Sequence, residues 1–210
     1  PIALSESLKY LKFLFFEIPF RYRWETLLGY FLDQRDGLLF YSPVYLFALL
    51  GLTSLKKFNF RLLSLIIFLT GPYLLAYAWL TQRGGYAPQA RPVVTIIWSL
   101  AIFLAFFLAN PSKIFITPLF KVCLIMSWLF LGLQLKYPHS LYQPTTQGET
   151  QRAGELFLYL SNLHFDLPRY LPSFLKIDNS QWWPNWSWLG LIIILILIYP
   201  LLPQKKHTTF

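Results

Sequence analysis

Residues 33–55 read DQRDGLLFYSPVYLFALLGLTSL and set three charges directly against a long run of apolar residues. Asp33, Arg35 and Asp36 stand at the start of this run, and the next charges, two lysines, come only after it ends. Roughly 20 mainly apolar residues are needed for one helical crossing of a bilayer. The stretch therefore predicts a membrane-spanning helix that has both signs of charge at one end and only positive charge at the other.

The composition of the whole chain is that of a membrane protein. Among 210 residues, 56% are hydrophobic, 20% are aromatic and only 13% are charged, whereas soluble domains carry about 25% charged residues. The single cysteine, Cys123, lies within an apolar run, and the three histidines share no ligand spacing. We therefore expect no disulfide within the chain, no metal site and no cofactor.

Five apolar runs are candidates for membrane crossings, and the last of them, near the C-terminus, is a little short but contains the uncharged stretch LGLIIILILIYPLL. The predicted crossings are residues 37–55, 62–80, 93–109, 114–135 and 188–202. The sequence thus predicts an all-α protein, a polytopic transmembrane helix bundle of about five crossings. Residues 1–203 form its single transmembrane domain, and residues 204–210 form a tail.

The distribution of charge predicts which side each connecting segment faces. Six lysines and arginines and no acidic residue occupy one set of segments, at residues 56–61, 110–113 and 204–207. All nine acidic residues lie in the other set, at residues 1–36, 81–92 and 136–187. Short loops rich in lysine and arginine stay in the cytoplasm, so the first set and the C-terminal tail are expected there. The net charge of +9 is then a signal of topology, and no nucleic-acid partner is expected.

Two of the outer segments contain patterns typical of amphipathic helices at the membrane surface. Residues 4–18 carry an apolar stripe but too many charges for a crossing, and GELFLYLSNLHF (154–165) carries the stripe Leu156, Leu160 and Leu163. Tryptophans cluster in QWWPNWSW (181–188), as expected of an aromatic belt. Asn185 begins a glycosylation sequon, which we discount because it lies so close to the predicted membrane.

The outer loop TQRGGYAPQARPVV (81–94) has the residue types of an anion-binding segment. Arg83 and Arg91 supply planar guanidinium groups that suit a phosphate or pyrophosphate. Gly84 and Gly85 allow the backbone to approach a ligand closely. By position alone, the simpler interpretation is that both arginines reach the phosphates of bulk lipid without a specific role. In the same way, the DQRD charges could form an ordinary turn that ends a helix.

Two stretches resemble segments of the polytopic GT-C glycosyltransferases, a superfamily that includes bacterial protein mannosyltransferase and aminoarabinose transferase types. DGLLFYSPVYLFALLGL (36–52) is similar to their segment D-x-R-x-G-L-L-x-Y-S-P, and GGYAPQARPVV (84–94) is similar to their loop W-G-G-x-x-x-G-P-R. The resemblance spans roughly residues 30–110. The chain departs from the loop pattern at Arg83, where the family has tryptophan, and at 89–90, where Gln-Ala replaces Gly-Pro.

The resemblance implies an enzyme that takes a sugar from a polyprenyl-phosphate donor on the outer side of a bacterial plasma membrane. Its partners are this donor and membrane lipids. Arg83, Arg91, Gly84 and Gly85 are expected near the lipid phosphate, whereas Asp33, Arg35 and Asp36 are expected at the adjoining rim. The family's catalytic acid lies in a first outer loop, which we expect before Pro1 in a longer protein.

The sequence leaves three further questions open. Asp33 and Asp36 could accept a proton, although their spacing around Arg35 suggests an ion-paired cap at a helix start. A transporter or flippase of a lipid-linked or anionic substrate is the alternative function, and a non-enzymatic membrane subunit is the weakest one because its small-residue seams are not evident. The sugar, the acceptor and the oligomeric state are not indicated.

Overall fold

The computed structural model describes residues 2–81, 91–109, 116–141, 154–161, 164–174 and 182–201, and helices are the only regular elements there. The α-helices are α1 (Ile2–Lys12), α2 (Phe20–Leu32), α3 (Leu38–Tyr41), α4 (Leu46–Phe58), α5 (Phe60–Trp79), α6 (Arg91–Val94), α7 (Ile97–Ala109), α8 (Ile116–Lys136), α9 (Glu155–Leu160) and α10 (Trp182–Ile198). Short 3₁₀ or π turns are η1 (Phe13–Glu17), η2 (Pro43–Tyr45), η3 (Pro138–Leu141), η4 (Leu167–Arg169) and η5 (Tyr199–Leu201). The predicted all-α class is confirmed for this part of the chain.

Three helical stretches are long and apolar enough to cross a membrane, each with 20 residues: Phe60–Trp79, Thr117–Lys136 and Trp182–Leu201. They correspond to the predicted crossings 62–80, 114–135 and 188–202. Twenty residues span about 30 Å, the thickness of the hydrocarbon core. Large apolar side chains such as Phe68, Leu135 and Leu197 stay exposed along these helices, as expected of surfaces that face lipid. These are the properties of a membrane protein.

The other two predicted crossings are interrupted. The run 37–55 breaks at Ser42 and Pro43 into α3, η2 and α4, because proline has no N–H to continue a helical ladder. At this break the Val44 N–H donates to Ser127 Oγ of α8 at 3.3 Å. Residues 91–109 likewise divide into α6 and α7. The 13 residues of α4 or α7 reach only about 20 Å.

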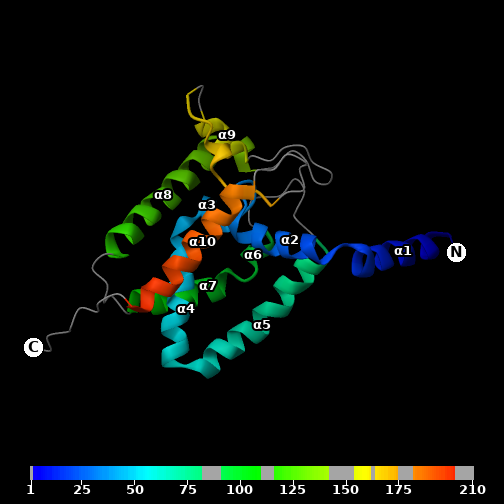
Figure 1. Cartoon of the computed structure of the whole chain (residues 1–210), viewed down its shortest axis with the longest axis horizontal. Helices are drawn as coiled ribbons and strands as arrows, with labels where there is room; N and C mark the ends of the chain where they lie inside the picture. Colours follow the sequence, from blue (N-terminus) through cyan, green and yellow to red (C-terminus); the bar gives the residue numbers. More distant parts are fainter. Residues whose placement is uncertain are drawn as a thin grey trace, which may run out of the picture.

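Helix α4 lies at the centre of the bundle and packs along α7 (Figure 1). Phe47, Ala48, Leu50 and Leu55 of α4 are fully buried. A Cβ atom added to Gly51 would collide with the carbonyl group of Phe103 on α7, so the two backbones touch at this glycine. The small residues of α4 thus form a tight helix seam, which the sequence analysis did not identify.

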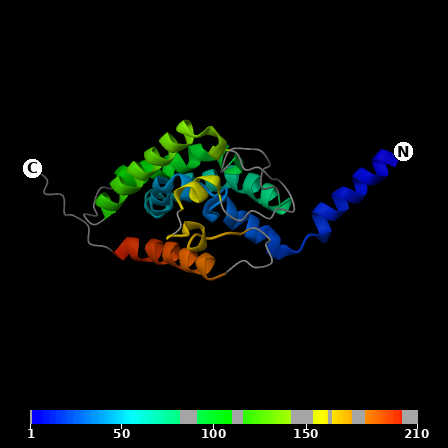
Figure 2. The same ribbon diagram turned by 90° about the horizontal axis from the view of Figure 1, so that it is seen from above.

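Two of the long helices cover opposite sides of this centre. Figure 2 shows α10, in orange and red, on one side of the bundle and α8, in light green, on the other. The α4 residue Phe47 packs in a cluster that contains Cys123 of α8 and Ile196 of α10. Helix α4 is thus enclosed by other helices, whereas α7 is buried on its α4 side and keeps Trp98 and Leu108 exposed.

The predicted surface helix 4–18 exists as α1 and η1, and it extends away from the bundle (Figures 1 and 2). Leu8, Leu11 and Phe15 of the predicted stripe are exposed. Its placement at a membrane surface stays a prediction. In α9, Leu156 and Phe157 are the buried residues, whereas Leu160 is exposed; Leu163 lies outside the described residues. The predicted stripe is therefore buried at Leu156 and exposed at Leu160, and at Leu163 it stays a prediction.

Candidate functional site

The predicted site residues fall into two groups. Arg83, Gly84 and Gly85 lie outside the described residues, and Arg91 is the first residue of α6. Asp33 and Arg35 are buried, with 0% and 3% of their surface exposed, and Asp36 is half-buried. The two buried residues therefore lie inside the protein and not on an open rim.

Residues 33–37 form a tight turn between α2 and α3, which we call the DQRDG turn. The Asp33 side chain accepts a hydrogen bond from the Arg35 N–H at 2.8 Å, and the Gly37 N–H donates to the Asp33 carbonyl at 2.7 Å. A Cβ atom at position 37 would lie only 2.6 Å from that carbonyl oxygen. Glycine is needed here because any side chain would meet the backbone of the same turn. Gly37 is also the N-cap of α3 and offers it no side-chain cap.

The DQRDG turn binds a segment more than 130 residues further along the chain. The second carboxylate oxygen of Asp33 accepts from the Phe174 N–H at 2.5 Å. Gln34 donates its backbone N–H to the Pro172 carbonyl at 2.9 Å, and its side-chain amide donates to the carbonyls of Pro168 and Leu171. Residues 168–174, the docked segment, are thereby held against the start of the broken helix.

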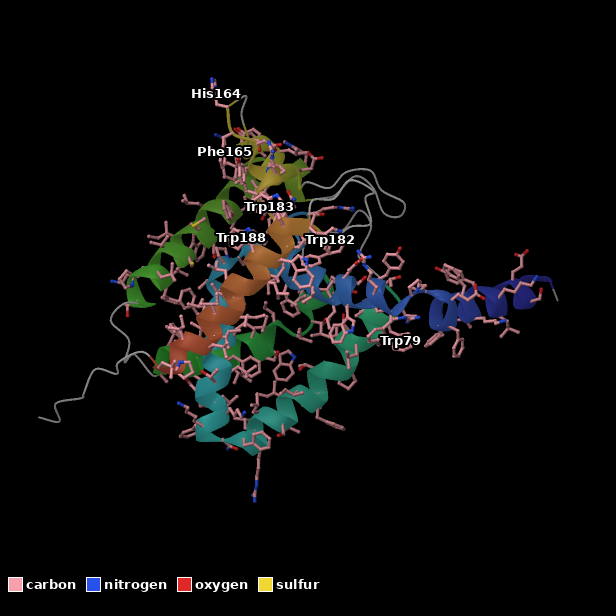
Figure 3. All side chains as sticks on the ribbon, viewed as in Figure 1. Trp79, His164, Phe165, Trp182, Trp183 and Trp188 are labelled. Atoms are coloured by element: carbon pink, nitrogen blue, oxygen red, sulfur yellow. The ribbon has the colours of Figure 1, made fainter. Side chains whose placement is uncertain are left out.

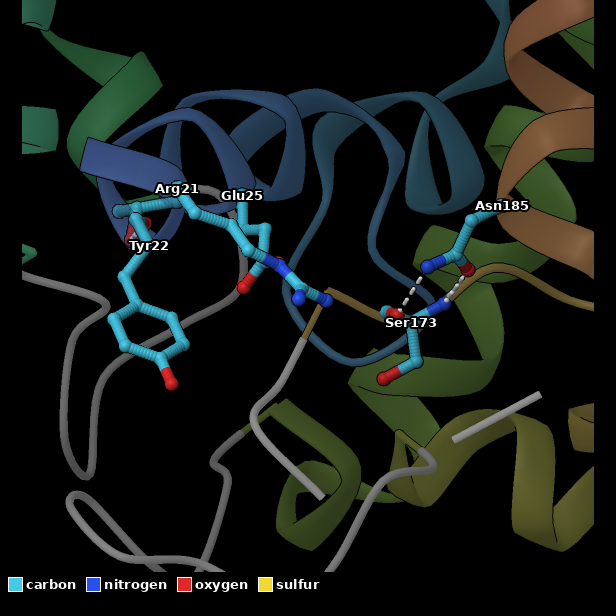
Figure 4. Close-up of polar contacts among 6 residues, drawn as sticks. Arg21, Tyr22, Glu25, Ser173 and Asn185 are labelled. Carbon is cyan, nitrogen blue, oxygen red and sulfur yellow. Dashed lines mark hydrogen bonds and ion pairs between the residues drawn. The ribbon is translucent and has the colours of Figure 1, made fainter. Parts of the chain in front are cut away.

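Helix α10 fixes the same segment from its other side. The Asn185 side chain accepts from the Ser173 N–H and donates to the Ser173 carbonyl, both at 2.7 Å (Figure 4). Asn185 is only 3% exposed, so its amide is fully used inside the protein. The sequence analysis discounted the sequon at this position, and the buried amide supplies a physical reason why a glycan does not fit there.

We expect Asn185→Ala to destabilise the protein by about 2 kcal/mol, because it leaves the buried N–H and carbonyl of Ser173 without partners. The free energy of unfolding in detergent micelles measures this change. Ser187→Ala is the matched control, since it also removes the sequon but Ser187 is exposed. Equal effects of the two substitutions would contradict a structural role for the Asn185 amide.

Two polar atoms at this junction are buried without a hydrogen-bond partner in the part of the chain that the structure describes. They are Gln34 Oε1 and Ser173 Oγ. Buried polar atoms are nearly always satisfied by protein, water or a ligand. Gln34 Oε1 can accept a hydrogen bond, and Ser173 Oγ can both donate and accept one. The junction can therefore bind a hydroxyl group or a water molecule.

A pair of tyrosines lies beside this region, at the end of α8 and on α9. The rings of Tyr137 and Tyr159 are 4.9 Å apart between centroids. The pKa of Tyr137 is lowered, first by a hydrogen bond from the Tyr159 side chain and second by Lys136. The same hydrogen bond raises the pKa of Tyr159. Exposed aromatic rings are also found at this end of the molecule, where Figure 3 places Phe165, Trp182 and Trp183.

Sequence reasoning missed several residues that build this region. Gln34 was taken only as part of a charged turn, and the Asn185 amide was considered only for glycosylation. Nothing in a single sequence pairs either residue with a segment so distant in the chain.

Among the described residues, no group of three histidine, cysteine or acidic side chains could hold a metal ion.

Comparison with known proteins adds no assignment: no protein-family model matches the chain, and no curated protein or solved structure matches it.

Proposed function

We propose that this chain is part of a membrane glycosyltransferase that transfers a sugar from a polyprenyl-phosphate donor on the outer face of a bacterial plasma membrane. The observation that carries the proposal is the environment of the DQRDG turn. The turn is buried, joins α2 to a broken central helix and holds the docked segment in place. Such irregular backbone inside a membrane bundle is tolerated only where protein or a site surrounds it.

The chemistry of the proposal depends on the arginines of the 81–94 segment. Negative charge grows on the donor phosphate as the bond between sugar and phosphate oxygen breaks. Arg83 and Arg91 would stabilise this charge more in the transition state than in the ground state, and Gly84 and Gly85 would allow close approach of backbone. The Asp33 carboxylate accepts two backbone N–H groups, so we assign it to support of the site and not to proton transfer.

The proposed topology has about five crossings, with the interrupted helices α3–α4 and α6–α7 serving as two of them. The segments between α4 and α5 and after α10 would face the cytoplasm. The DQRDG turn, the 81–92 segment and residues 136–187 would then share the outer side, where a lipid-linked donor is met.

A transporter or flippase of a lipid-linked or anionic substrate is the second candidate function. It is favoured by the two interrupted helical stretches that meet at the centre of the bundle, because transporters bind substrates at discontinuous helices. Paired broken helices were not evident from the sequence.

Replacement of Arg91 by alanine in the full-length protein tests the proposal. Turnover of a radiolabelled polyprenyl-phosphate sugar is expected to fall roughly 100-fold, as when one charge-stabilising donor is removed. Arg61→Ala, at the predicted cytoplasmic end of α5, is the control. Unchanged turnover in Arg91→Ala would remove the phosphate assignment. Movement of a fluorescent polyprenyl phosphate across vesicles without any sugar transfer would favour the flippase.

A further inference from the structure

Arg23 is a buried arginine near the start of α2, with only 5% of its surface exposed. A buried charge is costly unless it is well hydrogen-bonded. The dipole of α2 itself does not favour a cation at this position, because the N-terminal end of a helix carries partial positive charge. Its stabilisation has to come from other elements.

The ends of two other helical segments, α5 and η1, accept hydrogen bonds from the guanidinium group of Arg23. Nη1 donates to the Trp79 carbonyl at the end of α5, at 2.5 Å. Nη2 donates to the carbonyls of Phe15 and Ile18, at the end of η1, at 3.0 and 3.2 Å. The guanidinium carbon also lies 4.0 Å from the centroid of the Trp79 ring. Figure 3 places Trp79 at this end of α5, next to the start of α2.

The geometry suits arginine alone among the basic side chains. The last carbonyls of a helix lack intrahelical partners and carry the negative end of its dipole. The forked guanidinium group can donate to several such carbonyls at once and stack on an aromatic ring, whereas lysine is a compact point charge. Arg23 therefore caps two helix ends and joins them to α2.

Helix α2 also holds the start of α6. Val93 of α6 is fully buried in one cluster with Tyr30 of α2 and Ala78 of α5. The end of α5 and the beginning of α6, where Arg91 lies, are thus both packed on α2. The hydrogen bond from Arg23 to the Trp79 carbonyl fixes the end of α5.

We infer that Arg23 is a positioning residue, which sets the end of α5 relative to α6, the helix that begins at the proposed phosphate-binding residue Arg91. This inference rests on the proposed function for its consequence, but its structural part can be tested alone. Sequence analysis gave no indication of it, because Arg23 is one of two similar arginines in FRYRWE (20–25).

Comparison of Arg23→Lys with Arg21→Lys in the full-length protein tests the inference. Arg21 is the matched control because it lies on the same helix turn, but its side chain is 66% exposed and paired with Glu25. In Arg23→Lys, amide hydrogen exchange at Leu80 and Thr81 is expected to rise about tenfold, since the carbonyl cap is lost. Affinity for polyprenyl phosphate, measured well below the unfolding temperature, is expected to fall roughly tenfold. Arg21→Lys should change neither quantity.

The outcomes separate the inference from the proposed function. Unchanged exchange at Leu80 and Thr81 in Arg23→Lys would overturn the inference. The inference would also be overturned if Arg23→Lys bound polyprenyl phosphate as tightly as the native protein while Arg91→Ala bound it weakly. Failure of the proposed function has a different signature, in which Arg91→Ala and the native protein bind polyprenyl phosphate equally. If Arg23→Lys does not fold, Trp79→Leu removes only the ring contact and should raise exchange at the same two amides by a smaller factor.

Discussion

Replacement of Gly51 by alanine is expected to destabilise the protein by about 3 kcal/mol, although alanine is the better helix former. The new methyl group would occupy the space of the Phe103 carbonyl group on α7. A backbone carbonyl cannot move aside as a flexible side chain can, so α4 and α7 would have to separate. Their separation would disturb the fully buried residues Phe47 and Leu50 next to the seam. Unfolding of the purified protein by sodium dodecyl sulfate in mixed micelles measures the loss.

Gly132→Ala is the matched control for this prediction. Gly132 lies within α8, and no atom lies within 4 Å of an added Cβ there. Alanine at this position should leave stability unchanged or raise it by up to about 1 kcal/mol. Equal stability of the Gly51 and Gly132 variants would show that α4 and α7 do not touch at Gly51.

Asp33→Ala is expected to destabilise the protein by about 4 kcal/mol. The carboxylate is fully buried and accepts from the backbone N–H groups of Arg35 and Phe174. Both donors would stay buried without it, and each such loss is worth about 1–3 kcal/mol. Chemical unfolding gives the total, and amide exchange at Phe174 should accelerate because the docked segment loses its attachment.

Two variants sharpen this second prediction. Asp33→Asn keeps the shape and one acceptor oxygen but presents an NH₂ group to one of the two donors, so its loss should be smaller than that of alanine. Asp166→Ala removes an exposed acid next to η4 and should stay within about 0.5 kcal/mol of the native protein. Slow exchange at Phe174 in Asp33→Ala would show that this carboxylate does not hold the docked segment.

The long membrane helices could be predicted because length and hydropathy alone decide whether a helix can cross a bilayer. The predicted crossings 62–80, 114–135 and 188–202 therefore each correspond to a long apolar helix in the structure. The interruptions at Ser42–Pro43 and at Thr95–Ile96 were not predicted, because apolar content stays high on both sides of each break and a proline does not by itself end a membrane helix: Pro72 lies inside the continuous helix α5. The short helices α4 and α7 pack against each other, and a local sequence pattern does not show which helices will be neighbours.

The predicted location of the charged side chains in the DQRDG turn differs from their location in the structure. The resemblance implied that Asp33 and Arg35 lie at the rim of the site, whereas both side chains are buried. The partner of Asp33 is a backbone N–H at position 174, and backbone donors leave no trace in sequence. The roles of Arg83, Gly84, Gly85 and Arg91 in binding stay predictions.

The small-residue seam escaped prediction for a related reason. A repeated pattern of small residues was sought, and the crossings are mostly bulky. One glycine in α4, next to the fully buried Ala48, is enough to bring two backbones together. Its importance depends on which residue of α7 faces it.

The proposed phosphate site requires that the end of α5 face the outer side of the membrane. A single cysteine at Thr81, in a protein with Cys123→Ser, should react in intact cells with a maleimide that cannot cross membranes. A cysteine at Asn59, between α4 and α5, should react only after the cells are opened. Labelling of position 59 but not of position 81 in intact cells would put the proposed phosphate site in the cytoplasm and contradict the account.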